Sequence, residues 1–259
     1  KIRNRMQDLG YPIFVQSNDR SDDGFTSLSD RAAALIAKKV EEKNLQEDKS
    51  NKRAKKDNKI SSDEYAAWTC AAWLDVRSFG QVFAFNKKKE KDAAGVSVGV
   101  RGPISIHQAV SIDPVELCSY QITKSVNGEN KEGKEGKASD TMGMKHMIKF
   151  GMYEIKGAIN VQLAEKTGFT DNDAEVVKKC LLSLFENDAS SARPDGSMEI
   201  VKLYWWQHSC KEGQYSSAKV HRSVKAKLKD GLSEAQSADD YDIVVNELPG
   251  LVPEVLEGV

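Results

Sequence analysis

Alternating side chains over residues 153–163 constrain the fold more than any other stretch of the sequence. A period of two is typical of a strand that buries one face. The same period over residues 96–106, interrupted at Gly102-Pro103, predicts a second strand with a bulge or bend. The chain is therefore predicted to contain a half-buried sheet. The apolar positions of the first pattern are Tyr153, Ile155, Ile159, Val161 and Leu163.

Helical patterns lie between and around these strands. A Thr170-x-x-Asp173 capping box begins an amphipathic helix that extends to Phe185. Other helices are predicted over residues 1–9, ending at Gly10, over 29–40 with Ser29 as N-cap, over 62–74 and over 219–229. Further strands are predicted at 11–15, 121–126, 198–206 and 241–245. The irregular alternation favours an α+β fold with a split βαβ sheet of the ferredoxin or RRM type, heavily inserted, over a doubly wound fold.

The organisation is that of a single domain over residues 1–259 that carries insertions. Residues 46–59 have no apolar periodicity and are typical of an inserted linker. Residues 127–137 contain only Asn, Gly, Glu and Lys. No apolar run approaches the ~20 residues of a membrane helix, so no membrane partner is expected. The chain begins inside a predicted helix, so we expect a further N-terminal segment.

Charge is distributed unevenly along the chain. Residues 230–259 hold eight acids and no Lys or Arg, which leaves 38 basic and 31 acidic residues in 1–229, a formal charge of +7. A basic body permits a phosphate-binding surface without requiring one, because lysines also serve solubility.

Few residues point to catalysis. The sequence has no P-loop, dinucleotide-binding, nucleophile-elbow or zinc-protease motif. The four cysteines (70, 118, 180 and 210) are far apart, which predicts buried, inert thiols in a reducing cytoplasm and no metal site. The four histidines (107, 146, 208 and 221) have no partner visible in the sequence, although any imidazole can act as a general base.

Several side chains are candidates for contact with nucleic acid, each with a simpler alternative. Arg101, just before a glycine, can fork onto a phosphate or form a surface salt bridge. Arg193 can clamp a phosphate or cap the preceding helix. Trp205 and Trp206 are neighbours on a strand, so one should face the core and the other the opposite face, where it stacks on a base or simply packs.

Longer stretches carry a family resemblance. The sequences "VRGPISIHQAVSIDPV", "TMGMKHMIKFGMYEIKGAINVQLAEKTGF" and "LFENDASSAR" together resemble the crRNA-binding backbone subunit of the CRISPR Cascade complex. The similarity is greatest to the subtype I-C version, with the I-B version a close relative. "KIRNRMQ", "DVRSFG" and "YDIVVNE" agree with it, so the resemblance extends from Lys1 to about Val245.

The resemblance implies a hand-like fold. Its palm is a modified RRM fold, with inserted helical fingers at about residues 29–75 and a thumb hairpin at residues 120–146, whose tip is 127–137. The family's first strand, with its Asn/Gly/Asp-rich segment, is missing from this chain, and we expect the full protein to contain it.

The resemblance also implies which residues bind RNA. An apolar wedge on the thumb separates bases, and Met142 or Met144 fits it, although both can equally pack on a neighbouring strand. Lys145 and His146 then reach phosphates at the thumb base. The remaining carried-over positions are Lys1, Arg3, Arg5, Arg77, Ser78, Phe79, Arg101, Gly102, Ser111 and Arg193.

The function implied is that of a non-catalytic scaffold without cofactor or metal. It polymerises along crRNA and presents the guide to a target DNA strand in antiviral defence. The partners implied are copies of itself and the large, small and guide-processing subunits of the complex. The rival hypothesis is an RRM-like endoribonuclease that cleaves CRISPR repeat RNA with His107 or His146 as base. A third is a small-molecule enzyme with an aromatic pocket at Trp205 and Trp206.

Overall fold

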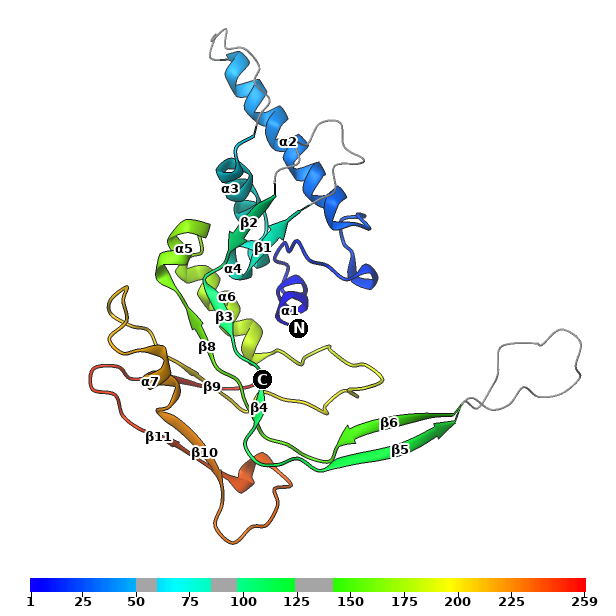
Figure 1. The fold of residues 1–259 in the computed structure, drawn as a ribbon, viewed down its shortest axis with the longest axis vertical. Helices are drawn as coiled ribbons and strands as arrows, with labels where there is room; N and C mark the ends of the chain where they lie inside the picture. Colours follow the sequence, from blue (N-terminus) through cyan, green and yellow to red (C-terminus); the bar gives the residue numbers. More distant parts are fainter. Residues whose placement is uncertain (50–59, 85–96, 124–141) are drawn as a thin grey trace, which may run out of the picture. The chain divides into compact units, whose positions relative to one another are not determined.

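The computed structural model describes residues 1–49, 60–84, 97–123 and 142–259, and Figure 1 shows their helices and strands. The described chain divides into two compact units. Unit 1 comprises residues 1–106, 157–217 and 248–259, and unit 2 comprises residues 107–156 and 218–247. Helices and strands mix throughout, which confirms the α+β class. The thumb tip at 127–137 and most of the 46–59 linker lie outside the described residues.

Unit 1 holds six helices and three antiparallel strand pairs among its described residues. The helices are α1 (Ile2–Asp8), α2 (Leu28–Lys49), α3 (Ser62–Ala72), α4 (Leu74–Phe79), α5 (Val161–Thr167) and α6 (Asp171–Leu182), with a 3-10 turn, η1 (Asn18–Arg20). The strand pairs are β1 (Gly80–Phe83) with β2 (Val98–Arg101), β3 (Ile104–Ile106) with β8 (Gly157–Ile159), and β9 (Lys202–Trp205) with β12 (Glu254–Glu257).

Unit 2 is built mostly of antiparallel strand pairs. They are β4 (Val110–Ser111) with β7 (Tyr153–Glu154), β5 (Leu117–Thr123) with β6 (Met142–Ile148), and β10 (Val224–Leu228) with β11 (Tyr241–Val245). Helix α7 (Ser217–His221) precedes β10, and a 3-10 turn, η2 (Ala238–Asp240), precedes β11.

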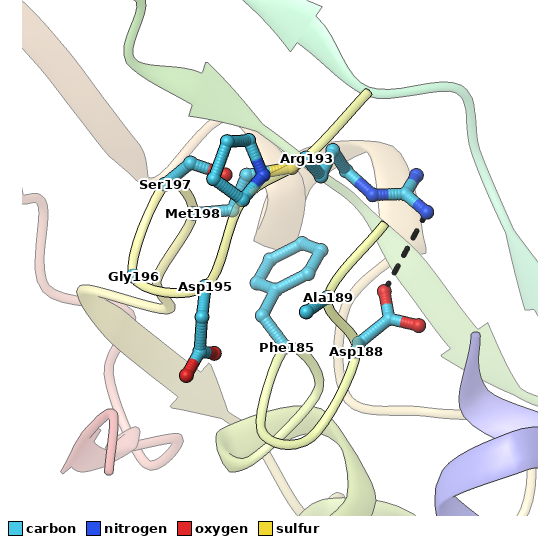
Figure 2. Close-up of a pocket in the computed structure, with 9 residues that line it drawn as sticks. Phe185, Asp188, Ala189, Arg193, Asp195, Gly196, Ser197 and Met198 are labelled. Atoms are coloured by element: carbon cyan, nitrogen blue, oxygen red, sulfur yellow. Dashed lines mark ion pairs between the residues drawn. The ribbon is translucent and has the colours of Figure 1, made fainter. Parts of the chain in front are cut away.

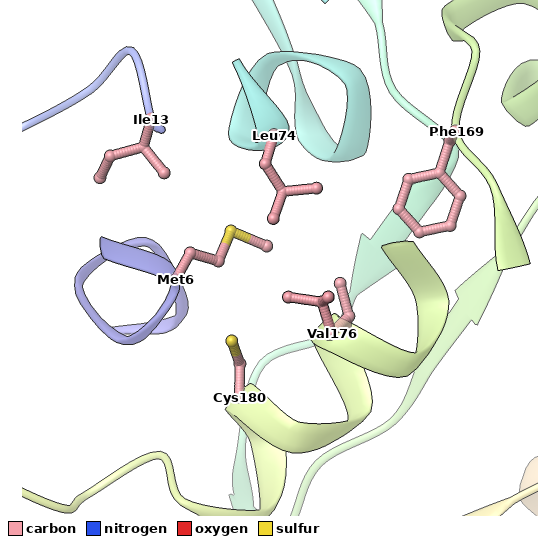
Figure 3. Close-up of a cluster of buried hydrophobic side chains, with 7 residues drawn as sticks. Met6, Ile13, Leu74, Phe169, Val176 and Cys180 are labelled. Carbon is pink, nitrogen blue, oxygen red and sulfur yellow. The ribbon is translucent and has the colours of Figure 1, made fainter. Parts of the chain in front are cut away.

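Two apolar clusters form the core of unit 1, and the short helix α4 contributes to both. In the first, Met6 of α1 and Leu74 of α4 lie against Val176 and Cys180 of α6 (Figure 3). The second contains Val76 of α4 together with three aromatic rings and three smaller residues. Its members are Phe14, Ala32, Cys70, Trp73, Val76, Phe83 and Val98. Helix α4 therefore holds α1, α3 and α6 in one packed arrangement.

The strand predicted over residues 153–163 is wrong in its second half. Residues 153–159 form the short strands β7 and β8, but α5 begins at Val161. The side chain of Asn160 accepts a hydrogen bond from the Leu163 backbone N–H at 2.9 Å, which caps that helix. The N-cap signal at Asn160 thus ends the strand that the apolar alternation alone would have continued.

Three other sequence predictions need correction. Helix α2 begins at Leu28, and Ser27 rather than Ser29 accepts the Asp30 backbone N–H. Residues 11–15 are not a strand, because the backbone N–H groups of Phe14 and Val15 donate to the Asp75 carboxylate. Residues 219–229 are not one helix, since α7 ends at His221 and β10 follows. In contrast, α1, α6 and β11 lie where the sequence predicts them.

The strands of unit 2 between residues 107 and 156 form an irregular antiparallel ribbon. Residues 108 and 109 lie opposite residue 155, between the His107–Lys156 hydrogen bond and the Val110–Glu154 pair. Residues 113–115 likewise lie opposite 150 and 151. Each offset adds one residue to the outgoing strand and is typical of a bulge, which increases twist and changes the face that later side chains occupy.

The acidic end of the chain pairs with its last basic stretch. In the ladder of β10 and β11, Lys227 lies opposite Asp242, and the Lys229 N–H donates to the Asp240 carbonyl at 2.9 Å. Lys227 also forms an ion pair with Asp230 at 2.6 Å. The acids of residues 230–242 therefore compensate the lysines of β10 within unit 2.

Candidate nucleic-acid interface

Arg3 connects the "KIRNRMQ" motif, to which it belongs, with the "DVRSFG" motif of unit 1. Its Nε donates to Asp75 Oδ2 at 3.0 Å, and its guanidinium lies 5.2 Å from the ring centre of Phe79. The Asp75 side chain is 1% exposed and also accepts the Phe14 and Val15 backbone N–H groups. Because the carboxylate is held by these backbone groups, it fixes Arg3 on the surface beside Phe79.

Arg193 lies in the loop that follows α6, beside a shared carboxylate. Backbone hydrogen bonds in both directions between Ser190 and Arg193 make a tight turn. Asp188 pairs with Lys1 Nζ at 2.5 Å and with an Arg193 terminal nitrogen at 3.7 Å (Figure 2). Two cations therefore share one carboxylate, so this cluster keeps a positive charge.

The same loop retains unused hydrogen-bonding groups. Asp188 Oδ2 and Arg193 Nε are buried and have no hydrogen-bond partner among the described residues. They lie at a small pocket whose lining also includes Phe185 and Ser197 (Figure 2). A buried donor without a partner is costly, so the Nε group is suited to an incoming acceptor such as a phosphate oxygen or water.

Arg5 is engaged within unit 1. Its Nε donates to Ser183 Oγ at 2.8 Å, just past the end of α6, and Asp8 lies 3.9 Å from one of its terminal nitrogens. These contacts tie α1 to α6 beneath the surface that carries Lys1 and Arg193.

The "DVRSFG" and "RGP" motifs meet through two glycines. A Cβ on Gly102 would lie 2.3 Å from the Phe79 carbonyl carbon and 2.4 Å from the Gly80 nitrogen. Gly80 has φ +80°, and its Cβ would lie 2.3 Å from the Val100 oxygen. Only glycine fits this contact, so the close approach holds the end of β2, with exposed Arg101, against the start of β1.

Arg77 and Ser78 of the "DVRSFG" motif differ in their partners. Ser78 is fully buried, and its Oγ has no hydrogen-bond partner among the described residues. Arg77 forms two hydrogen bonds to Asp173, at 3.1 and 2.7 Å. Burial would raise the pKa of Asp173, but the Arg77 and Thr170 hydrogen bonds and the Arg77 charge outweigh it, so the pKa lies below its ordinary value.

In unit 2 the candidate residues of the thumb occupy both faces of the β5–β6 hairpin. Directly opposite residues share a face, and the face alternates along each strand. Met142, Met144 and His146 therefore lie on one face, and Lys145 lies on the other with Tyr120. Met142 and Met144 are 65% and 57% exposed, and the Gln121 side chain on β5 donates to Met142 Sδ at 2.7 Å. Ser111 lies apart from them, half-buried in β4.

The histidines and the Trp pair have partners that the sequence did not reveal. His107 contacts the ring of His221 edge-on at 5.3 Å, and His208 accepts the Gln214 backbone N–H at 3.0 Å. Trp205 lies under Lys178, whereas Trp206 stacks near Tyr204 on the other face of β9. Within the described ranges, no three His, Cys, Asp or Glu side chains gather to hold a metal. No described helix is long and apolar enough to cross a membrane.

Sequence reasoning named the basic residues of the site but missed the acids that position them. Asp75, Asp173 and Asp188 each hold a cation that the sequence marked for RNA contact. Asp75 and Asp188 each gave one local signal, since they belong to the "DVRSFG" and "LFENDASSAR" motifs, the second of which also contains Arg193. The Arg77–Asp173 and Lys1–Asp188 pairs span 96 and 187 residues, beyond the reach of a local pattern.

Comparison with known proteins adds one match. A family model described as "CRISPR-associated protein Cas7" matches residues 1–246. No curated protein matches the chain.

Proposed function

The chain belongs to the Cas7 family of CRISPR-associated proteins, and from this membership we propose that it is a non-catalytic backbone subunit that binds crRNA in a type I surveillance complex. We further propose the subtype I-C assignment. In this proposal, copies of the chain polymerise head to tail along the guide and leave its bases free to pair with a target DNA strand. The large, small and guide-processing subunits complete the complex.

The observation that carries the proposal is the apolar exposure of the β5–β6 hairpin. Seven large apolar side chains of this two-stranded ribbon are exposed: Leu117, Tyr120, Ile122, Met142, Met144, Met147 and Ile148. A lone ribbon of two strands is at best marginally stable in water, and contiguous exposed apolar surface marks an interaction site. Bases that are separated and stacked against the Met142–Met144 face would cover the four of these side chains that share it, Leu117, Met142, Met144 and Ile148.

Cations in unit 1 supply the sequence-independent part of the binding. Arg101 is exposed beside the Gly80–Gly102 contact, and Lys1 and Arg193 share the single carboxylate of Asp188. Arg3 presents its guanidinium beside Phe79. Guanidinium groups fork onto phosphate oxygens, so these residues would hold the guide backbone whatever its sequence.

The rival reading as an endoribonuclease rests on the histidines. His107 has an imidazole neighbour in His221, and an acid–base pair of that kind would be needed for RNA cleavage. The His107→Ala and His146→Ala variants decide between the two readings in a repeat-RNA cleavage assay. Cleavage by the wild-type protein that either variant loses would overturn the scaffold proposal, and repeat RNA left intact by the wild-type protein would support it.

The test of the main proposal is binding of labelled single-stranded guide RNA, measured by fluorescence anisotropy over a salt series. We expect tight binding whose logarithm falls linearly with the logarithm of salt concentration. The Arg101→Gln variant should weaken binding at every guide sequence and reduce the salt slope by about one. Lys211→Gln is the control, because it removes a cation that pairs with Glu165 outside the candidate site. Absence of binding at low salt would overturn the proposal.

A further inference from the structure

Ser119 and His146 form a direct cross-strand contact on the β5–β6 hairpin. They lie opposite each other in the ladder, and Ser119 Oγ is 2.8 Å from His146 Nδ1. Both side chains are exposed. The hydrogen bond uses Nδ1 and leaves Nε2, the outer nitrogen of the ring, for another partner.

His146 is the one group on its face, among the described residues, that can become positively charged. It shares the face with polar or apolar side chains that do not titrate: Leu117, Ser119, Gln121, Thr123, Met142, Met144 and Ile148. The titratable residues Cys118, Tyr120 and Lys145 alternate onto the opposite face. Glu116 and Lys149, just beyond the ladder, pair with each other at 3.3 Å.

His146 lies near the exposed methionines, so RNA bound on them would reach its imidazole. It lies two residues from Met144 and four from Met142 on the same strand, so successive side chains of this face are ~7 Å apart. A strand of nucleic acid that covers the methionines would bring a phosphate or base edge to the imidazole. A neutral imidazole is a weak contact for a phosphate, and an imidazolium is a strong one.

We propose that Ser119 is a positioning residue that holds His146 with Nε2 outward, so that the guide RNA is bound more tightly when the imidazole takes up a proton. This inference rests on the proposed RNA-binding function and adds a proton-dependent contact to it. The serine hydroxyl suits the role because it can donate to a neutral Nδ1 and accept from a protonated one. Ser119 can therefore hold the His146 ring in the same orientation in both charge states.

The experiment measures the Kd of labelled single-stranded RNA at pH 6 and pH 8, at constant ionic strength. Imidazole groups change charge between these pH values. We expect the wild-type protein to bind about 3- to 10-fold more tightly at pH 6, as one gained charge-assisted contact predicts. His146→Gln should bind the RNA with the same affinity at pH 6 and at pH 8. His208→Gln, which changes a histidine of unit 1 held by a backbone N–H, should keep the ratio.

Two further variants test the role of Ser119. Ser119→Ala should lower the pH 6 to pH 8 ratio toward that of His146→Gln, and Ser119→Thr, which keeps a hydroxyl, should restore it. A Ser119→Ala variant with the wild-type ratio would overturn the positioning role. A full ratio in His146→Gln would overturn the whole inference while the RNA-binding function stands. Wild-type protein that binds no RNA at either pH would overturn both.

Discussion

At the scale of single residues, two glycines determine how the "DVRSFG" and "RGP" motifs meet in unit 1. Gly80 and Gly102 bring backbone against backbone, at distances where a Cβ cannot fit. The backbone at Gly102 has no positive φ, so this glycine is required by space and not by conformation. This separates it from the glycines that end helices, such as Gly10 and Gly168, which have left-handed φ and open surroundings.

Gly102→Ala should therefore destabilise the protein by about 3 kcal/mol, because the backbone of Phe79 and Gly80 must move away from the new methyl group. Gly99→Ala is the matched control in the adjoining strand β2, since nothing lies within 4 Å of its Cβ position. Urea unfolding measures both. Equal stability of the two variants would show that the junction adjusts freely.

Cysteine reactivity follows burial residue by residue. Burial raises the pKa of the Cys70 and Cys180 thiols to about 11, which leaves little thiolate at neutral pH. Cys210 is exposed. We expect iodoacetamide at pH 8 to label Cys210 first and to leave Cys70 and Cys180 unmodified in the native protein, as mass spectrometry of peptides can measure. Labelling in urea, where all four should react, is the control. Native labelling of Cys180 at the rate of Cys210 would contradict this.

Elements are held together by ion pairs as well as by apolar contacts. The Arg77–Asp173 pair joins α4 to the first turn of α6, where Asp173 also completes the capping box with Thr170. A carboxylate at a helix N-terminus is favoured by the backbone N–H groups there. The sequence marked Arg77 for RNA contact, whereas in the structure its guanidinium fixes one helix on another.

Arg77→Met should lower the free energy of unfolding by about 2 kcal/mol, because it leaves a largely buried carboxylate with one fewer partner. The pair should also make stability depend on pH. Since the folded-state pKa of Asp173 is below the ordinary 3.8, its contribution is complete above that value and is lost as pH falls through the lowered pKa. The wild-type and Arg77→Met unfolding free energies should therefore converge as the pH falls through this lowered pKa. A difference that does not shrink in acid would contradict the assignment.

The β5–β6 hairpin is the element on which RNA binding should depend most. Met144→Ser should weaken binding of guide RNA by about 1–2 kcal/mol, or roughly 5- to 30-fold in Kd, because it removes apolar surface that bases would cover. Val244→Ser, at 56% exposure on β11, is the matched control for loss of an exposed apolar side chain in the same unit. Anisotropy measures both, and equal effects would argue against a specific role of the hairpin.

At the scale of the whole molecule, the acidic end of the chain is paired with basic residues, although the sequence separates it from the basic body. The acidic residues near the C-terminus do not form a separate acidic tail, because β11 places Asp242 opposite Lys227. The candidate cations of unit 1 are arranged differently. Lys1 and Arg193 share one carboxylate, which keeps a net positive charge at that surface.

A scaffold that polymerises on a guide should assemble in proportion to its length. We expect sedimentation velocity to show protein without RNA as a monomer, and mixtures with guides of two lengths as complexes whose copy number rises with length. A duplex DNA of equal length should not support the assembly, since its bases cannot separate around the hairpin. The same single copy on both guides would contradict polymerisation while leaving RNA binding intact.

The sequence by itself determined the features that depend on neighbours along the chain. The end of α1 at Gly10, the capping box at Thr170 and the bend at Gly102-Pro103 each follow from residues within three or four positions. The resemblance that located the basic motifs and the hairpin is confirmed at the level of the Cas7 family. At Asn160 two local signals conflict, the apolar alternation and the N-cap side chain, and the alternation predicts the wrong structure.

Only the tertiary structure decided which carboxylate each cation meets and which face each hairpin residue occupies. Arg77 and Asp173 are 96 residues apart, and their contact exists because the apolar faces of α4 and α6 pack in one cluster. The bulges between residues 107 and 123 shift the register of β5 on β6 by two residues, and this register places Ser119 opposite His146. Local patterns cannot specify such pairings, because a side chain's partner across the fold is fixed by the packing of whole elements.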